Sequence, residues 1–143
     1  MTYIGIDCGT NTGLAVWDSD AQRFDRLETV QLHQALSFVL HTYFEQDREG
    51  LTVVFEDARQ RTWFPKERNL SEYRGRLMGA GYVRRDSAIW EEFLTFYGIP
   101  FHAVPPQKGA TKWTAQQFAA LTRWTGKTSE HSRDAALLVW GRQ

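Results

Sequence analysis

The sequence has a single cysteine, Cys8, and no long apolar run. One cysteine cannot form an intrachain disulfide, which excludes the disulfide-rich class of small secreted proteins and fits a reducing compartment. The longest stretch without a charged side chain, residues 29–44, contains polar side chains at amphipathic spacing and is too short to cross a bilayer. We therefore expect a soluble, cytoplasmic protein with no secretory signal and no membrane contact.

An excess of charge of one sign is also missing, because 17 Lys and Arg balance 17 Asp and Glu. A zero total argues against a strongly basic nucleic-acid-binding protein. However, residues 1–56 hold 9 acids and 3 bases, a net charge of −6, and the rest holds 14 bases and 8 acids, a net charge of +6. Residues 101–129 contain no acid, and phosphate contacts by the bases there would supply salt-sensitive affinity for nucleic acid. The distribution of charge is thus more informative than its sum.

The chain has 143 residues, of which 42% are hydrophobic and 14% aromatic. This is enough apolar material for a packed core and too short a chain for two typical domains, so we expect a single domain over residues 1–143.

Hydrophobic periodicity predicts an α/β fold. Apolar segments separated by turn residues predict three antiparallel strands. A short β-branched run predicts a buried parallel strand, and helical spacing predicts a long helix interrupted near Gly79 and Gly81. The expected strands are 3–7, 13–17, 23–30, 51–55 and 101–104. The expected helices are 31–46, 70–97, 111–124 and 131–140, the last capped by Thr128 or Ser129. Together they predict a mixed five-stranded sheet with helices on both faces.

The long helix is expected to have an apolar face, and its glycines would let a neighbouring element pack closely against it. The residues on that face are Leu70, Tyr73, Leu77, Ile89, Phe93 and Phe96. Gly75 and Gly79 lie one turn apart in the same helix, and each glycine costs about 1 kcal/mol relative to alanine, so a packing reason is expected. The neighbour is either the equivalent helix of a second copy or the protein's own sheet.

Three acidic residues occupy positions typical of a metal site. Asp7 and Glu56 each end an apolar strand, and Asp134 lies near the start of the last helix, with His131 three residues earlier. Carboxylates at neighbouring strand ends repel one another, and a divalent cation such as Mg²⁺ relieves that repulsion. Taken singly, each acid also fits a solvated strand end or a helix cap, and the histidine fits an ordinary polar residue.

Three segments in this order resemble the RuvC family of Holliday junction resolvases. They are Ile4-Gly5-Ile6-Asp7-Cys8-Gly9-Thr10-Asn11-Thr12-Gly13, Val54-Phe55-Glu56 and His131-Ser132-Arg133-Asp134-Ala135-Ala136. The similarity extends over nearly the whole chain. It implies the RNase H-like fold and a bacterial or phage-infected cell as the setting.

The resemblance also implies an activity. Family members are homodimeric endonucleases that nick two strands of like polarity in a four-way DNA junction. Asp7, Glu56, His131 and Asp134 would bind two Mg²⁺ ions, which Mn²⁺ can replace, and the ions would activate water and stabilise the leaving 3′ oxygen. Lys108 or Lys112 would contact the scissile phosphate, although a solvated lysine is the ordinary alternative. The dimer would form through the long helix 70–97.

The segment 57–69 is expected to be a long exposed loop that contacts DNA. It combines aromatic with basic side chains, and aromatic residues in a basic loop stack on unpaired bases. Covering an apolar surface or joining the dimer contact is the alternative role for its aromatics. The candidate DNA contacts are Arg59, Arg61, Trp63, Phe64, Lys66, Arg68, Lys108 and Lys112.

Other functions are compatible with parts of the pattern. Residues 7–12 also resemble the phosphate-binding hairpin of actin-like and sugar-kinase ATPases, a reading that leaves Glu56 and Asp134 without a role. Another RNase H-like nuclease, acting on other branched DNA or on RNA–DNA hybrids, would use the same metal site. A junction-binding protein without catalysis is the third alternative. Cys8 is expected to be a buried strand residue without chemistry.

Overall fold

The computed structural model describes residues 1–45, 50–63, 69–107 and 112–143. The elements in chain order are β1 (Thr2–Asp7), β2 (Asn11–Asp18), β3 (Arg23–Gln31), α1 (Leu32–Glu45), β4 (Leu51–Glu56), the 3₁₀ helix η2 (Ala58–Gln60), α2 (Leu70–Tyr97), β5 (Phe101–Val104), α3 (Ala115–Thr122) and α4 (Glu130–Leu137). The α/β class and the order of these elements agree with the sequence-based prediction.

The strands form one mixed sheet in the order β3-β2-β1-β4-β5. β1 pairs antiparallel with β2, and β2 pairs antiparallel with β3. β4 runs parallel to β1, and β5 runs parallel to β4. The five-stranded mixed sheet and the antiparallel arrangement of its first three strands are therefore confirmed. Because β1 and β4 are parallel neighbours, Asp7 and Glu56 end their strands at the same edge of the sheet.

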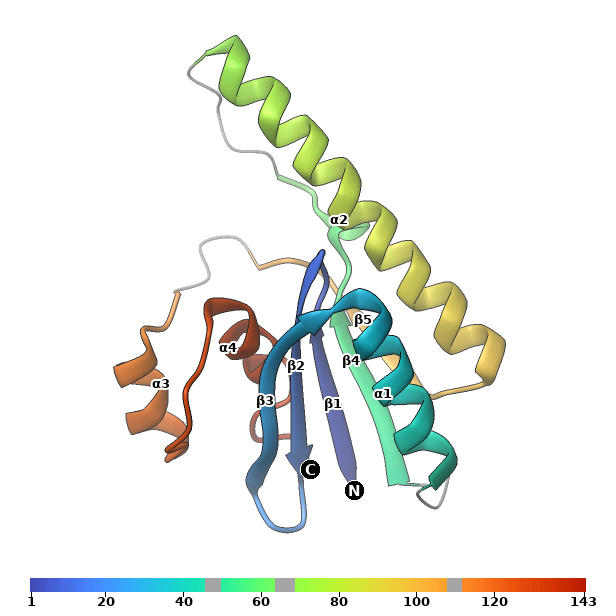
Figure 1. Ribbon diagram of the computed structural model, residues 1–143, viewed down its shortest axis with the longest axis vertical. Coiled ribbons are helices and arrows are strands. Elements are labelled where there is room, and N and C mark those ends of the chain that lie inside the picture. The colour runs from blue at the N-terminus through green and yellow to red at the C-terminus, as the bar shows by residue number, and fades with distance from the viewer. Residues whose placement is uncertain (46–49, 64–68, 108–111) are drawn as a thin grey trace.

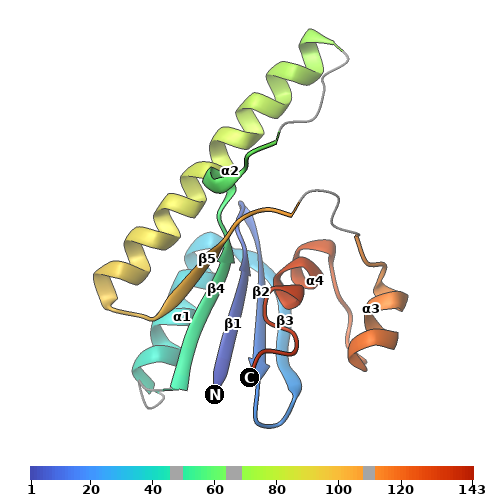
Figure 2. The same ribbon diagram turned by 180° about the vertical axis from the view of Figure 1, so that it is seen from behind.

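Helices cover both faces of the sheet (Figures 1 and 2). Side chains alternate along a strand, so Ile4 and Ile6 of β1 lie on one face and Tyr3 lies on the other. On the first face the core includes Ala35 and Val39 of α1 and Trp90 and Leu94 of α2. On the second face it includes Phe118 of α3, Ala135 and Ala136 of α4, and Val139 just after that helix.

The long helix α2 is continuous, so the predicted interruption near Gly79 and Gly81 is wrong. Glycine keeps its backbone N–H, so it weakens a helix without breaking it. The Asn69 side chain caps the helix by accepting a hydrogen bond from the Glu72 backbone N–H, and the helix ends at Tyr97 as predicted. Apart from the helix's own backbone, a Cβ atom at Gly75, Gly79 or Gly81 would meet no atom of the described residues within 4 Å. The alternative that these glycines pack on the protein's own sheet is therefore wrong.

The apolar face predicted for α2 is only partly confirmed: Phe93 packs against the core and Ile89 is half-buried, but the other predicted residues are exposed. The N-terminal half of the helix projects beyond the sheet (Figure 1), and only residues 86–94 reach the core. Leu70, Tyr73, Leu77 and Phe96 are all exposed, Phe96 by 82%. The helix buries Asp86, Ser87, Trp90 and Leu94 instead. Where the helix crosses the sheet decides which side chains are buried, and hydrophobicity along the chain does not contain that information.

Three further boundaries differ from the predictions. α3 covers 115–122 in place of 111–124, because Thr114 caps its N-terminus with its side chain and with Gln117 in a capping box. α4 covers 130–137 in place of 131–140, with Ser129 as its cap, which was one of the two residues expected. In the expected exposed loop 57–69, Asp57 is only 4% exposed and residues 58–60 form η2. Among the described helices, none has the length and apolarity needed to cross a membrane.

Candidate active site

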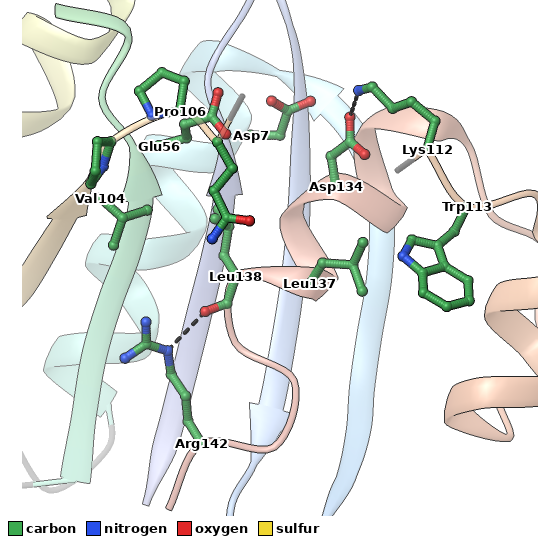
Figure 3. A pocket seen from close by; sticks show the side chains of 12 residues that line it. Asp7, Glu56, Val104, Pro106, Lys112, Trp113, Asp134, Leu137, Leu138 and Arg142 are labelled. Atoms are coloured by element: carbon green, nitrogen blue, oxygen red, sulfur yellow. Dashed lines mark hydrogen bonds and ion pairs between the residues drawn. The ribbon is translucent and has the colours of Figure 1, made fainter. Parts of the chain in front are cut away.

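A pocket of about 680 Å³ lies at the end of the sheet where β1 and β4 terminate. Asp7 from β1, Glu56 from β4 and Asp134 from α4 all line it. Figure 3 shows these carboxylates gathered at one end of the pocket. The rest of the lining consists of Val104, Pro105, Pro106, Gln107, Lys112, Trp113, Leu137, Leu138 and Arg142. Three acids far apart in the sequence therefore share one pocket.

Two glycines allow α4 to bring Asp134 to this edge. A Cβ atom at Gly13 of β2 would lie 1.9 Å from the backbone oxygen of His131, and one at Gly5 of β1 would lie 2.1 Å from that of Ala135. Real side chains do not approach so closely, so the helix backbone rests directly on the strands only because both positions lack a side chain. The glycines of the first motif thus position the residues of the last motif.

Asp7 and His131 form a direct contact. His131 Nδ1 lies 2.8 Å from Asp7 Oδ2. An ionised carboxylate only accepts hydrogen bonds, so the imidazole donates from Nδ1. The first and last motifs, which were expected to share one site, therefore contact each other directly.

Lys112 provides the positive charge beside the acids. Its ammonium group contacts the Asp134 carboxylate and lies 3.2 Å from Glu130 Oε1. Burial lowers the pKa of Lys112, but the hydrogen bonds to Asp134 and Glu130 raise it by more, so the net pKa is raised and the side chain remains charged. The Lys112 side chain is 62% exposed, so it remains accessible to a ligand at the mouth of the pocket.

The remaining acids are poorly compensated. Burial raises the pKa of Asp7, and the nearby Asp134 raises it further, against the hydrogen bond from His131. Burial also raises the pKa of Glu56, and repulsion from Asp7 adds to this effect, against the positive charge of Arg61. Both carboxylates would be more stable with another positive charge between them.

These donors fit a hard divalent cation in their chemistry. Carboxylate oxygens are the ligands that Mg²⁺ prefers, and the site keeps room for the water and phosphate oxygens that complete its coordination. Within the described ranges, no three His, Cys, Asp or Glu side chains already form a compact metal-binding group. Asp7, Glu56 and Asp134 would hold the ion, and His131 lies next to them through Asp7.

The basic loop residues have different environments. Arg59 binds Asp57 through two hydrogen bonds of 2.8 and 2.9 Å and also contacts Glu91 of α2. These partners hold its guanidinium within the protein and tie the segment after β4 to α2. Arg61 stacks over the Trp63 ring, with its guanidinium carbon 4.6 Å from the ring centroid. The predicted residues Phe64, Lys66, Arg68 and Lys108 lie outside the described part of the chain.

In the hairpin that resembles an ATPase phosphate loop, only Asp7 of the described residues lines the pocket. The Thr12 hydroxyl is buried and donates to the Gly9 carbonyl oxygen at 2.8 Å. Cys8 is buried, and burial followed by repulsion from Asp7 raises the pKa of its thiol far above the usual range. Its burial agrees with the prediction, although Cys8 follows the end of β1 and does not belong to the strand.

Several residues that line the pocket were not predicted from the sequence. Trp113, Leu137 and Arg142 line it, although none stands in a recognisable motif. The only sequence signal was the position of Trp113 directly after Lys112, between a strand end and a helix cap. Glu130, which shares Lys112 with Asp134, was also missed.

The fold and the pocket define an α/β protein with an acidic site at the carboxyl ends of two parallel strands. Comparison of the chain with models of protein families found no match, and comparison with curated proteins found none either.

Proposed function

We propose that the protein is a Mg²⁺-dependent endonuclease that resolves four-way DNA junctions by paired nicks. The observation that carries this proposal is the meeting of Asp7, Glu56 and Asp134 in one pocket, with Lys112 beside them. The sheet order β3-β2-β1-β4-β5, with its antiparallel first three strands, supports an RNase H-like fold. The resemblance to the RuvC family adds the junction as substrate.

The reaction is hydrolysis of a phosphodiester bond. Water oxygen forms a new bond to phosphorus, the bond to the 3′ oxygen breaks, and that oxygen takes up a proton. The products are a 3′ hydroxyl and a 5′ phosphate. When bound, Mg²⁺ supplies a Lewis acid that activates water and stabilises charge on the leaving oxygen.

The protein's own residues orient the acids and the phosphate. His131 restrains the Asp7 carboxylate through the 2.8 Å contact, so that the acid keeps one orientation. Lys112 is 62% exposed, so a DNA phosphate oxygen can reach its ammonium group and replace the contact with Asp134. Arg61 lies close enough to Glu56 for its positive charge to lower the pKa of that acid. These cations offset the repulsion between the acids and a phosphate.

The substrate panel tests the proposal. Wild type is incubated with Mg²⁺ and four labelled DNAs or hybrids: a four-way junction, a flap, a duplex and an RNA–DNA hybrid. We expect nicks in the junction, and about a 10³-fold slower rate for Asp7→Asn, which removes one charge from the metal site. Asp25→Asn, at an exposed acid paired with Arg23, is the matched control and should cut like wild type.

The other results distinguish the alternatives. If the flap or the hybrid is cut while the four-way junction stays uncut, the protein is another RNase H-like nuclease. Junction binding without cutting by wild type identifies a binding protein. Full activity in Asp7→Asn removes the acids from the reaction.

The dimer is expected to use the exposed N-terminal half of α2. This half presents Leu77 and Met78, which are 54% and 62% exposed, next to glycines with open space around them. Leu77→Glu should convert a dimer into monomers in sedimentation, whereas Phe96→Glu, at the other end of the same helix, should leave it intact. A monomeric wild type, with and without junction, contradicts the paired-nick proposal.

A further inference from the structure

The pocket is larger than the acidic site alone requires. Its volume of about 680 Å³ is in the range of pockets that hold whole organic ligands, whereas the acids occupy only one end (Figure 3). The acids lie at the upper end in that view, and Arg142 lies at the lower end. Between them the walls are apolar, formed by Val104, Leu137 and Trp113 among others. An apolar wall contributes nothing to binding a metal ion or a phosphate, so this region suits a different part of a ligand.

Trp113 supplies an aromatic wall. Its backbone oxygen accepts a hydrogen bond of 2.8 Å from Arg133 Nε, which ties this segment to α4. Arg133 Nη1 also donates to the Thr128 hydroxyl at 3.0 Å. The Trp113 side chain packs against the core on the second face of the sheet, but it remains half-buried and lines the pocket. A partly open indole is a platform on which a planar ring can stack.

Polar groups accompany the apolar wall. Gln107 lines the pocket and is exposed, so its amide can donate and accept. Arg142 is anchored by its Nε, which donates to the Leu138 carbonyl oxygen at 2.8 Å. A nucleobase is recognised by apolar walls, an aromatic ring on which it can stack and a few polar groups at its edges. This part of the pocket has all three.

We propose that this part of the pocket holds an unstacked nucleobase of the cut strand, next to the phosphate at the acids. The inference rests on the proposed function and extends it by naming a base-binding subsite. The subsite is continuous with the acids through the shared wall of Asp134 and Leu137 on α4. A base placed on Trp113 would position its own phosphate toward Asp134 and Lys112. Bases unstack most easily at a branch point, so this subsite favours branched DNA over a continuous duplex.

The binding test uses junctions in which 2-aminopurine replaces one base within two nucleotides of the cut bond. EDTA is present, so no strand is cut. With wild type we expect the fluorescence at one position to change on binding and to differ from that in Trp113→Ala, because stacking on the indole quenches the probe. Trp140→Ala is the matched control, since Trp140 is 40% exposed and does not line the pocket.

The kinetic test removes the base itself. Wild type should cut a junction with an abasic site at the same position about tenfold more slowly than the complete junction. Trp113→Ala should cut the complete junction more slowly than wild type by a similar factor. The abasic site should not slow Trp113→Ala any further. Trp113→Phe should recover most of the rate. Because Trp113→Ala also removes core contacts, Leu137→Trp provides a second variant that fills the pocket and should likewise abolish sensitivity to the abasic site.

The outcomes separate the two proposals. If wild type cuts no four-way junction, the proposed function fails, and the subsite fails with it. If wild type cuts the junction but abasic sites at every tested position slow wild type and both pocket variants equally, the subsite is overturned and the nuclease remains. An equal probe response in wild type and Trp113→Ala likewise overturns the subsite.

Discussion

Glu56 and Asp57 are adjacent acids with opposite environments. Burial and repulsion from Asp7 raise the pKa of Glu56, which lines the pocket. The hydrogen bonds from Arg59 lower the pKa of Asp57, which is only 4% exposed and faces away from the pocket toward Arg59. Successive side chains of an extended chain point in opposite directions, so one step along the backbone separates the two acids.

The contrast separates stabilising charges from functional ones. Asp57 is fully engaged: it accepts from Arg59, its backbone N–H donates to the Val104 carbonyl oxygen at 2.8 Å, and it caps η2. Glu56 shares its pocket with two other acids, and within the described part of the chain it gains no comparable set of donors. A carboxylate kept at an electrostatic cost is a candidate for binding a cation, whereas a satisfied one stabilises the fold.

The largest expected effect is on activity. Glu56→Gln keeps the size of the side chain but removes its charge, so cleavage of the four-way junction should fall about 10³-fold. Asp57→Asn should cut at a rate within about threefold of wild type at 20 °C, because its side chain does not reach the pocket. Single-turnover rates measure both. Equal losses in the two variants would remove the distinction between the acids.

The second prediction moves the acids without changing any charge. Gly13→Ala places a methyl group against the His131 backbone oxygen, 1.9 Å away, so α4 must shift and carry Asp134 with it. We expect cleavage to fall at least about tenfold and unfolding to become easier by about 1–3 kcal/mol. Gly81→Ala, in open space on α2, should be neutral or stabilising by roughly 0.5–1 kcal/mol. Urea denaturation and junction cleavage give the two readouts, and wild-type behaviour of Gly13→Ala would contradict the packing of α4.

The third prediction concerns the satisfied acid. Arg59→Ala leaves Asp57 buried without its main partner, so the free energy of unfolding should fall by about 1–3 kcal/mol. Arg23→Ala, at an exposed pair with Asp25, should change it by less than about 0.5 kcal/mol. Chemical denaturation at pH 7 measures both differences. A stable Arg59→Ala protein with reduced DNA affinity would instead assign Arg59 to DNA.

The smallest expected effect is on the pH dependence of stability in EDTA. A carboxyl whose folded pKa is raised binds its proton more tightly in the folded state, so stability falls as pH rises from the unfolded pKa, about 4, through the folded pKa. Glu56→Gln should therefore match wild type below that window and be more stable above it. Asp57 has a lowered folded pKa, so its contribution is present above the unfolded pKa and is lost as pH falls through the folded one. Asp57→Asn should be less stable than wild type near pH 7 and approach it in acid.

Urea midpoints from pH 2.5 to 7 check both directions. Parallel curves for the two variants would show that the neighbouring acids do not differ in environment.

Much of the fold was predictable because its signals are local. Strand ends, helical spacing and the Ser129 cap can be recognised in short stretches of sequence. Asp7 and Glu56 each end a strand, so parallel pairing of those two strands places both acids at the same edge of the sheet. The meeting of Asp7 with His131 followed from the family resemblance and not from any local pattern.

The sequence is least informative where distant contacts decide. It could not show that Arg59 contacts Glu91, because Glu91 lies on a helix that begins eleven residues later in the sequence. The exposed half of α2 looked like a core face because its apolar residues have helical spacing, but the sheet ends before it. Trp113 looked unremarkable because the pocket around it is assembled from α4 and β5.

The central claim is that the acids around Asp7 form the site of metal-dependent junction cleavage. The most direct test is the cleavage rate of a labelled four-way junction with Mg²⁺ and with EDTA, for wild type and Asp7→Asn. We predict symmetric nicks in two strands of like polarity by wild type with Mg²⁺ only, and a rate about 10³-fold lower for Asp7→Asn. Nicking that continues in EDTA, or that Asp7→Asn performs at the wild-type rate, would contradict the account.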